Sequence, residues 1–413
     1  MRTSLLLTIL LLPLTSHALD FEHRDTVLLT DINGITSGRL GRAVGVNQGS
    51  VFMGAPEQDS GLGATYLYGI NDQRKLDFVK ELELQSPGTR RYGGAIATDG
   101  DIAAIGYEAG ILLEIYLRNG SDWVLSKTLE IPTIDGIEVR AFGNIIDLKG
   151  DFLVVGDPSA KVGAEANAGV VMIFGRHTGG ANNWGLINHF LDESPPENAD
   201  FPRSVAISDD LMVATDPANN RALLYRRNGI DWDFDRNLQP EQVEVDDRFG
   251  VSVEAEGDYI AVGAINGNEV ELPTNSGSVH IFHRNQGGSN SFGQLTQVYP
   301  STPEFIDRFG ESLRLRDGLL VVGAPGAQQV YVFARFTGAW LEEQLLLPPV
   351  GLDFFNAEFG LDVDYHEGSL VVGSDRWPDI EGERFGAVFL YEDWGTVLCK
   401  VLNAIYCDGF EAN

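Results

Sequence analysis

The fold of this 413-residue chain is decided by one recurring stretch, whose clearest copy reads Phe309-Gly310-Glu311-Ser312-Leu313-Arg314-Leu315-Arg316-Asp317-Gly318-Leu319-Leu320-Val321-Val322-Gly323-Ala324-Pro325. Asp317-Gly318 predicts a tight turn between two strands, because Gly adopts positive φ without steric cost. The run that follows the turn is almost wholly apolar. Such a run is typical of a strand buried on both faces.

Related copies recur along the whole chain. A degenerate copy, Phe201-Pro202, fills the largest gap, and the successive spacings are 52, 50, 59, 48, 60 and 50 residues. Periods near fifty with strand-like content indicate propeller blades, since helical solenoid repeats are usually shorter. The sequence therefore predicts seven copies, and the Gly of each of the other opening pairs falls at Gly41, Gly93, Gly143, Gly250, Gly310 and Gly360.

Each copy divides into four predicted strands, A to D. Strand A is the Phe-Gly-x-Ser-Val segment, as in Phe249–Val253, and strand B is the apolar run after the turn. Strand C alternates, as in Gly277–Phe282, and strand D follows a polar turn and often opens with Trp. We expect an all-β, seven-bladed β-propeller of four-stranded antiparallel blades over residues 19–398.

These copies resemble FG-GAP repeats, the blades of the integrin alpha-subunit propeller and of many secreted bacterial proteins. Gly54-Ala55-Pro56 and Gly323-Ala324-Pro325 match the second half of the repeat's name, and the resemblance runs from about Thr26 to Tyr391. It implies a binding or adhesion module that recognises a protein or glycan at the cell surface or matrix.

The two ends of the chain fall outside the repeats. Residues 1–18 read as a signal peptide, which predicts a secreted, extracellular or periplasmic protein. Thr26–Leu29 resembles an orphan strand D that closes the ring, and Trp394–Leu398 is the alternative. The tail at 399–413 holds the two cysteines, Cys399 and Cys407, which in an oxidising compartment we expect to form a disulfide.

The charge of the chain excludes some classes of binding partner. The formal net charge is −31 and is spread along the chain. Nucleic acid and anionic membrane both attract basic surfaces, so we expect neither as a partner, and no stretch after the signal peptide is apolar enough for membrane insertion. There is no Gly-x-Ser-x-Gly elbow, His-Glu-x-x-His motif or phosphate loop, so no enzyme is predicted.

The resemblance to integrin-type blades suggests calcium as a cofactor. Integrin-type blades often carry an Asp-x-Asp-x-Asp-Gly loop between strands A and B. Here the equivalent turns shrink to Asp99-Gly100-Asp101, Lys149-Gly150-Asp151 and Glu256-Gly257-Asp258. Turns this short cannot wrap the six or more oxygen ligands that Ca²⁺ takes. We therefore expect no cofactor and no metal.

Loop lengths indicate which face binds. The A–B and C–D turns share one face of an up-and-down propeller, and the longer B–C and D–A loops share the other. Long loops on a rigid scaffold commonly carry binding sites. We expect Phe354, Phe355 and Trp377 to be exposed aromatic anchors there, with Arg376 as flanking charge.

The residues that immediately precede strand A give a second hypothesis for the binding site. Immediately before the opening pairs of four repeats stand Arg39, Arg91, Arg248 and Arg308. They could ring the channel mouth and hold an anionic group. The alternative is that they pair with neighbouring acids such as Asp247 and Asp307. We keep two further functional hypotheses open. One is a structural envelope or matrix component, and the other is a polysaccharide-acting enzyme that uses Asp375, Asp379 and Glu383.

Overall fold

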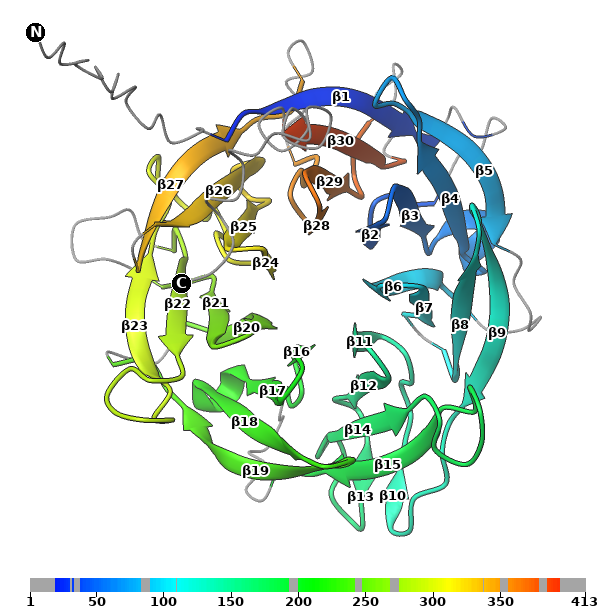
Figure 1. Ribbon diagram of the computed structural model, residues 1–413, viewed down its shortest axis with the longest axis vertical. Coiled ribbons are helices and arrows are strands. Elements are labelled where there is room, and N and C mark those ends of the chain that lie inside the picture. The colour runs from blue at the N-terminus through cyan, green and yellow to red at the C-terminus, as the bar shows by residue number, and fades with distance from the viewer. Residues whose placement is uncertain are drawn as a thin grey trace, which may run out of the picture.

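The computed structural model describes residues 19–393, apart from 30–31, 33–37, 83–89, 109, 193–199, 242–246, 268–274, 337, 350–355 and 379–384. In these residues the chain forms seven four-stranded antiparallel sheets around a central axis, like the blades of a propeller (Figure 1). The predicted seven-bladed β-propeller is confirmed. The expected residues Phe354, Phe355, Asp379, Glu383, Cys399 and Cys407 lie outside the described part of the chain.

The strands of each blade are given from the channel outward. Blade 1 comprises β2 (Val44–Asn47), β3 (Ser50–Ala55), β4 (Ala64–Ile70) and β5 (Leu76–Leu82). Blade 2 comprises β6 (Tyr92–Asp99), β7 (Ile102–Tyr107), β8 (Leu112–Asn119) and β9 (Asp122–Glu130). Blade 3 comprises β11 (Ile145–Lys149), β12 (Phe152–Asp157), β14 (Val170–Gly175) and β15 (Gly185–Phe190). Blades 4 and 5 comprise β16 (Val205–Ile207), β17 (Leu211–Asp216), β18 (Arg221–Asn228) and β19 (Asp231–Leu238); β20 (Phe249–Glu256), β21 (Tyr259–Ala264), β22 (Ser278–His283) and β23 (Gly293–Val298).

Blades 6 and 7 complete the ring. They comprise β24 (Ser312–Arg316), β25 (Leu319–Ala324), β26 (Gln329–Phe336) and β27 (Ala339–Leu346); β28 (Asp362–His366), β29 (Ser369–Ser374), β30 (Ala387–Asp393) and β1 (Phe21–Leu28). The remaining elements lie in loops: α1 (Gln58–Gly61), the 3₁₀ turn η2 (Pro217–Asn219), and a small ribbon of β10 (Ile137–Glu138) and β13 (Lys161–Val162).

The N-terminal strand closes the ring, as the sequence predicts. β1 pairs antiparallel with β30, from Phe21 opposite Asp393 to Leu28 opposite Ala387. It also reaches blade 6, because the Phe21 amide donates to Gln344 Oε1 at 2.8 Å and Gln344 Nε2 donates to the Phe21 carbonyl at 2.9 Å. The alternative strand, 394–398, lies outside the described residues.

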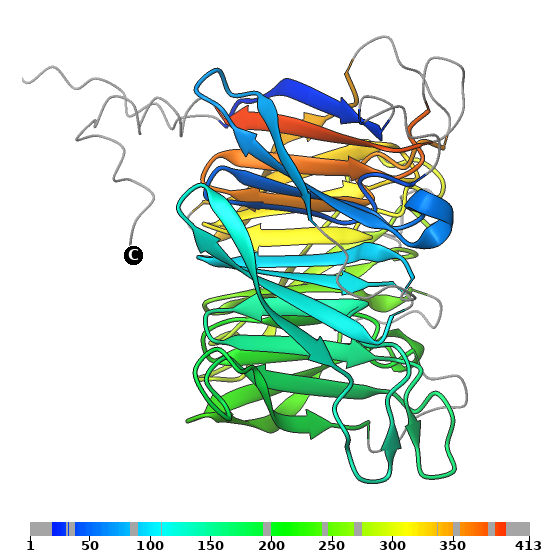
Figure 2. The ribbon, with the colours of Figure 1, turned by 90° about the vertical axis from the view of Figure 1, so that its right-hand side faces the viewer.

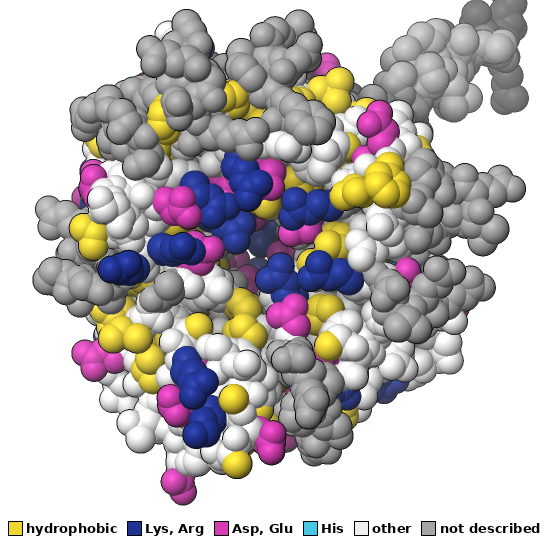
Figure 3. Space-filling view, turned by 180° about the vertical axis from the view of Figure 1, so that it is seen from behind, with side chains coloured by type: hydrophobic (Ala, Val, Ile, Leu, Met, Phe, Trp, Pro, Cys, Tyr) yellow, Lys and Arg dark blue, Asp and Glu magenta, His cyan; other side chains and the backbone are white. Residues whose placement is uncertain are grey.

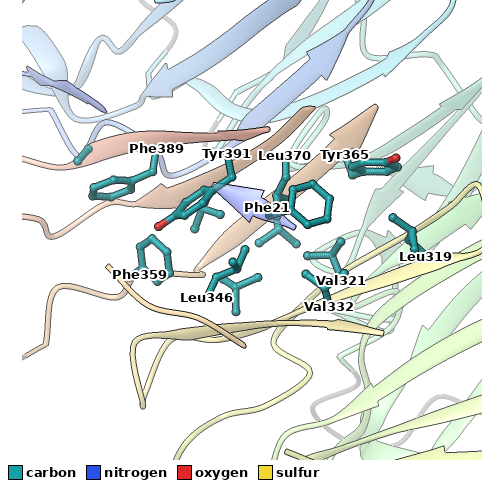
Figure 4. Close-up of a cluster of buried hydrophobic side chains, with 14 of the residues drawn as sticks. Phe21, Leu319, Val321, Val332, Leu346, Phe359, Tyr365, Leu370, Phe389 and Tyr391 are labelled. Atoms are coloured by element: carbon teal, nitrogen blue, oxygen red, sulfur yellow. The ribbon is translucent and has the colours of Figure 1, made fainter. Parts of the chain in front are cut away.

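The core lies between blades rather than at the centre of the ring. Figure 4 shows one such layer, in which Val321 and Val332 of blade 6 face Leu370 and Phe389 of blade 7, with Phe21 of β1 at the same layer. Each of these side chains is at most 3 % exposed. Burying one such side chain contributes about 1.5–3 kcal/mol, so seven repeated layers amply stabilise the ring.

The start of strand A differs from the prediction. The opening pair begins the innermost strand only in β6 and β20; in the other blades that strand starts two or three residues after the pair's second position. The glycines of the pair adopt φ between 81° and 104°, which takes the backbone out of β geometry before the ladder begins.

The loops divide between two faces. α1, η2 and β13 lie in B–C loops, and β10 lies in a D–A loop. Figure 2 shows α1 and the β10–β13 ribbon projecting on the right, the side that Figure 3 views. Six of the seven A–B turns have two residues between the strands, so the other face carries the short turns. Within the described residues, no helix is long and apolar enough to span a membrane.

Candidate functional site: an arginine-rich channel mouth

Four arginines and one glutamate share an unusual backbone position at the channel mouth. Each of them immediately precedes the opening pair of a blade, and φ is 57° at Arg39, 64° at Arg91, 54° at Arg248, 57° at Arg308 and 61° at Glu358. Positive φ favours Gly or Asn, so a long charged side chain is not the sterically easiest choice there. D–A loops deliver these residues to the innermost strands. Figure 3 shows Lys and Arg side chains, interspersed with Asp and Glu, around a central hollow on this face.

Ion pairs connect these arginines across blades 7, 1 and 2. Arg39 pairs with Asp375 of blade 7 and lies 3.4 Å from Glu57 Oε1. Arg91 lies 3.1 Å from Glu108 Oε2 and 3.9 Å from Glu57 Oε1. Burial raises the pKa of Asp375 to about 6, against the lowering effect of the Arg39 guanidinium. Asp375, one of the three acids of the enzyme hypothesis, is therefore a buried ion-pair partner.

A second group of pairs joins blades 6 and 7. Glu358 Oε1 lies 2.9 Å from Arg376 Nη1 and 3.6 Å from Arg308 Nη1, and Arg308 Nη2 also lies 2.9 Å from Glu311 Oε1. The side chain of Arg376 remains 45 % exposed. The predicted site residues Arg308 and Arg376 are thus brought together through one shared glutamate.

Arg248 differs from its counterparts. It is exposed, and no described acidic side chain lies within ion-pairing distance of it. It occupies the same backbone position in blade 5 that Arg308 occupies in blade 6, so the two arginines approach the mouth from neighbouring blades. Among the mouth arginines, Arg248 is the one for which the described residues hold no ion pair.

Charged groups also fill the channel below the mouth. Arg314 Nε of β24 lies 2.7 Å from Asp364 Oδ1 of β28, and its Nη1 lies 3.6 Å from Glu254 Oε2 of β20. Burial alone lowers the pKa of Arg314, but Asp364, Glu254 and Asp147 outweigh it and raise that pKa. The guanidinium therefore stays charged and holds blades 5, 6 and 7 together.

Channel carboxylates also connect neighbouring innermost strands, which do not form a backbone ladder with one another. Asp147 Oδ2 of blade 3 accepts from the Ile207 amide of blade 4 at 2.7 Å, and Asp364 Oδ2 of blade 7 accepts from the Val46 amide of blade 1 at 2.7 Å. Each carboxylate thus satisfies a backbone donor that would otherwise face the channel unpaired. These acids are structural links between blades.

One predicted aromatic anchor is wrong. Trp377 was expected to be exposed, but it is only 1 % exposed and packs edge-on against Phe389 of β30, with ring centroids 4.8 Å apart. Its B–C loop folds back over the blade, because the Trp377 amide donates to the Ser374 carbonyl and its carbonyl accepts from Phe385 and Gly386. Trp377 caps its own blade and cannot serve as an exposed anchor.

The structure exposes other apolar side chains on the same face. Phe305 and Ile306, in the D–A loop before blade 6, are 64 % and 49 % exposed. Leu62 and Ile111 in B–C loops and Leu347 in a D–A loop are 40 %, 55 % and 55 % exposed. The sequence signal for the first two is an apolar pair between Glu304 and Asp307, outside any predicted strand, which our loop-length criterion passed over.

One part of the repeated blade sequence matches a known family of sequence repeats. A sequence model of the FG-GAP repeat matches residues 232–282. The chain contains an FG-GAP repeat. The matched segment runs from Trp232 in β19 to Phe282 in β22, so it spans the outermost strand of blade 4 and most of blade 5. No curated protein sequence matches the chain.

Many solved structures match this chain in shape. One is a candidate 6-phosphogluconolactonase from Bacteroides fragilis, with 11 % sequence identity, a TM-score of 0.49, and coverage of 73 % of this chain and 82 % of that one. Within the described residues, no group of three or more His, Cys, Asp or Glu side chains is arranged to hold a metal ion.

Proposed function

We propose that this protein is an exported binding propeller that recognises a protein partner through its B–C/D–A face. The observation that carries the proposal is the arginine-rich mouth, on a chain whose formal net charge is −31. Arginines gathered at one place on an otherwise acidic molecule form a surface that attracts carboxylates, and this favours a role as a binding interface. The FG-GAP repeat is consistent with protein binding.

The scaffold suits recognition because it fixes the binding groups before a partner arrives. Mouth arginines are held at defined positions by ion pairs with Glu57, Glu108 and Glu358, and the strands beneath them are buried. Preorganised side chains lose little entropy on binding, which strengthens an interface without enlarging it. A glycan partner is the weaker form of the proposal, since the exposed apolar side chains on this face include aliphatic ones that do not stack on sugar rings.

A structural role in an envelope or matrix is the second candidate, and the cross-blade ion pairs favour it. The Arg39–Asp375 pair joins residues 336 positions apart in the chain and closes the ring at the mouth. If all mouth arginines served only as such links, they would need no partner. Arg248, which is exposed and without a described ion pair, is not accounted for by that role.

Binding of purified envelope and matrix proteins and of a glycan array by the immobilised chain tests the proposal. We would compare the parent with Arg248→Asn, which removes one charge at a position whose φ of 54° Asn tolerates. The matched control is Lys75→Gln, which removes one charge from an exposed C–D turn on the opposite face. Binding by the parent and by Lys75→Gln, weakened in Arg248→Asn, supports the proposal; no binding, or equal loss in both variants, contradicts it.

A further inference from the structure

The D–A loop before blade 6 is anchored at both ends. Ser301 Oγ donates to Glu342 Oε1 of β27 at 2.6 Å, and the Ser301 amide donates to Glu342 Oε2 at 3.2 Å. At the other end Asp307 is 1 % exposed, and its Oδ2 accepts from the Glu304 amide at 2.5 Å. The Gly326 amide donates to the Asp307 carbonyl at 3.0 Å. The loop is therefore held rigidly against its blade.

The tip of this loop directs apolar side chains outward. Phe305 is 64 % exposed and Ile306 is 49 % exposed. Ile306 has φ of 65°, a conformation that a β-branched residue rarely adopts. The Ile306 carbonyl packs closely on the next loop of the blade, since any Cβ on Gly326 would overlap it. Strain of this kind persists only where the rest of the structure imposes it, and it commonly accompanies binding sites.

Two arginines occupy equivalent positions in the blades on either side of this loop. Arg308 follows Ile306 by two residues and is partly exposed, and Arg248 takes the equivalent position in the preceding blade. The tip carries two acids, of which Glu304 is exposed and Asp307 is buried, and neither forms an ion pair with an arginine in the described residues. The described partners of Arg308 are Glu311 and Glu358. A rigid apolar pair flanked by arginine is the composition of an interface hot spot.

We propose that Phe305 and Ile306 anchor a protein partner whose surface offers an apolar pocket beside a carboxylate, with Arg248 receiving that carboxylate. This inference rests on the proposed function and specifies the partner's chemistry. An aliphatic side chain such as Ile306 needs an apolar pocket, which a protein supplies and a glycan does not. An anionic membrane surface is disfavoured by the net charge of −31.

Selection of a random-peptide display library on the immobilised full chain tests the inference. We expect enriched peptides to carry an aromatic or large aliphatic residue close to an Asp or Glu. Affinity of the synthesised consensus peptide, measured by fluorescence anisotropy, should fall by about tenfold or more in Phe305→Ser, Ile306→Asn and Arg248→Asn, as hot-spot truncations do. Ile230→Asn, at a 73 % exposed position in a C–D turn on the other face, should bind like the parent.

Ile306→Asn distinguishes a loss of binding from a loss of folding. Asn tolerates positive φ better than Ile does, so this variant should melt at the parent's temperature or above while losing the peptide. A lower melting temperature together with lost binding would count against the inference, because the loop would then serve folding. So would enriched peptides that lack acidic residues, or that bind Phe305→Ser as tightly as the parent.

Failure of this inference and failure of the proposed function give different results. If a purified protein binds the parent and loses affinity for Arg248→Asn but not for Phe305→Ser, the face binds protein and the Phe305–Ile306 anchor is wrong. If heparin or another acidic glycan binds while no protein or peptide does, both the protein partner and its anchor are contradicted.

Discussion

Gly323 of blade 6 packs against the carbonyl oxygen of Gly360 of blade 7 so closely that a Cβ on Gly323 would overlap that oxygen. Gly323 is the Gly of a Gly-Ala-Pro segment, and Gly360 is the Gly of the next blade's opening pair. Ser312 Oγ also donates to the Gly360 carbonyl at 2.9 Å. The two halves of the repeat motif therefore meet between blades, and the same contact recurs at Gly54–Gly93, Gly106–Gly143, Gly263–Gly310 and Gly373–Gly41.

Gly323→Ala should destabilise the protein by several kcal/mol, because the new methyl group would overlap both the Gly360 carbonyl oxygen and Ser312 Oγ, and overpacking of this kind costs at least about 1–3 kcal/mol. Urea unfolding of the full chain measures the change. Gly69→Ala in β4 is the control, since its Cβ would come no closer than 3.7 Å to Val79 Cγ2. Equal stability of the two variants would show that the inter-blade glycine contact is not a tight one.

Phe21→Ala should lower the free energy of unfolding by about 3 kcal/mol, at the low end of the range for a buried Phe because β1 is a terminal strand. Phe21 is 3 % exposed and packs against Tyr365 with ring centroids 6.0 Å apart. Phe78→Ala in the outer strand of blade 1, where the side chain is 54 % exposed, should change little. A parent-like melt for Phe21→Ala would mean that β1 contributes little to ring closure.

Stability should fall as the pH rises from about 5 to about 9. Burial in the channel raises the pKa of Asp147 to about 6, of Asp362 to about 7 and of Glu254 to about 8. A raised pKa in the folded state means that the native protein binds these protons more tightly than the unfolded chain does. The stabilisation is complete below the unfolded pKa values and is lost as the pH rises through each folded value.

Glu254→Gln tests which group dominates the pH dependence. The amide keeps an oxygen that can accept from the Leu315 backbone, as the carboxylate does, but cannot ionise. Its melting temperature should fall less than the parent's between about pH 6 and about pH 9. An identical slope in both proteins would place the titration elsewhere in the channel or on the surface.

Addition of a chelator should leave the melting temperature unchanged. The A–B turns at Gly100–Asp101, Gly150–Asp151 and Gly257–Asp258 have two residues each, too few to supply six or more oxygen ligands to Ca²⁺. Differential scanning calorimetry with and without EDTA, each followed by excess CaCl₂, gives the measurement. A fall of several degrees that Ca²⁺ reverses would mean that calcium binds despite the short turns.

Much of the fold could be predicted because its signals are local. Turn glycines such as Gly318, apolar runs such as Leu319–Val322 and their spacing of about fifty residues repeat along the chain, and each repeat dictates its own strands. The closing strand could be predicted in the same way. The N-terminal segment resembles a strand D without strands A to C of its own, so it is expected to complete a blade whose own repeat lacks a strand D.

The details of the binding face depended on contacts between distant residues. Trp377 looked like a loop aromatic, but its burial depends on Phe389 and on how its loop folds back, which no local pattern encodes. Phe305 is exposed because Asp307, Glu342 and Gly326 fix its loop with the tip outward. Both outcomes follow from tertiary packing.

By itself the sequence determined seven blades, the order of their strands and the face that carries the longer loops, since strand periodicity and glycine conformation act over a few residues. Only the tertiary structure decided which charges meet. Arg39 and Asp375 are 336 positions apart and pair because the ring closes, whereas Arg248 is left exposed without a described acidic partner. Ion pairing depends on distances of a few ångströms, and the closed ring sets those distances.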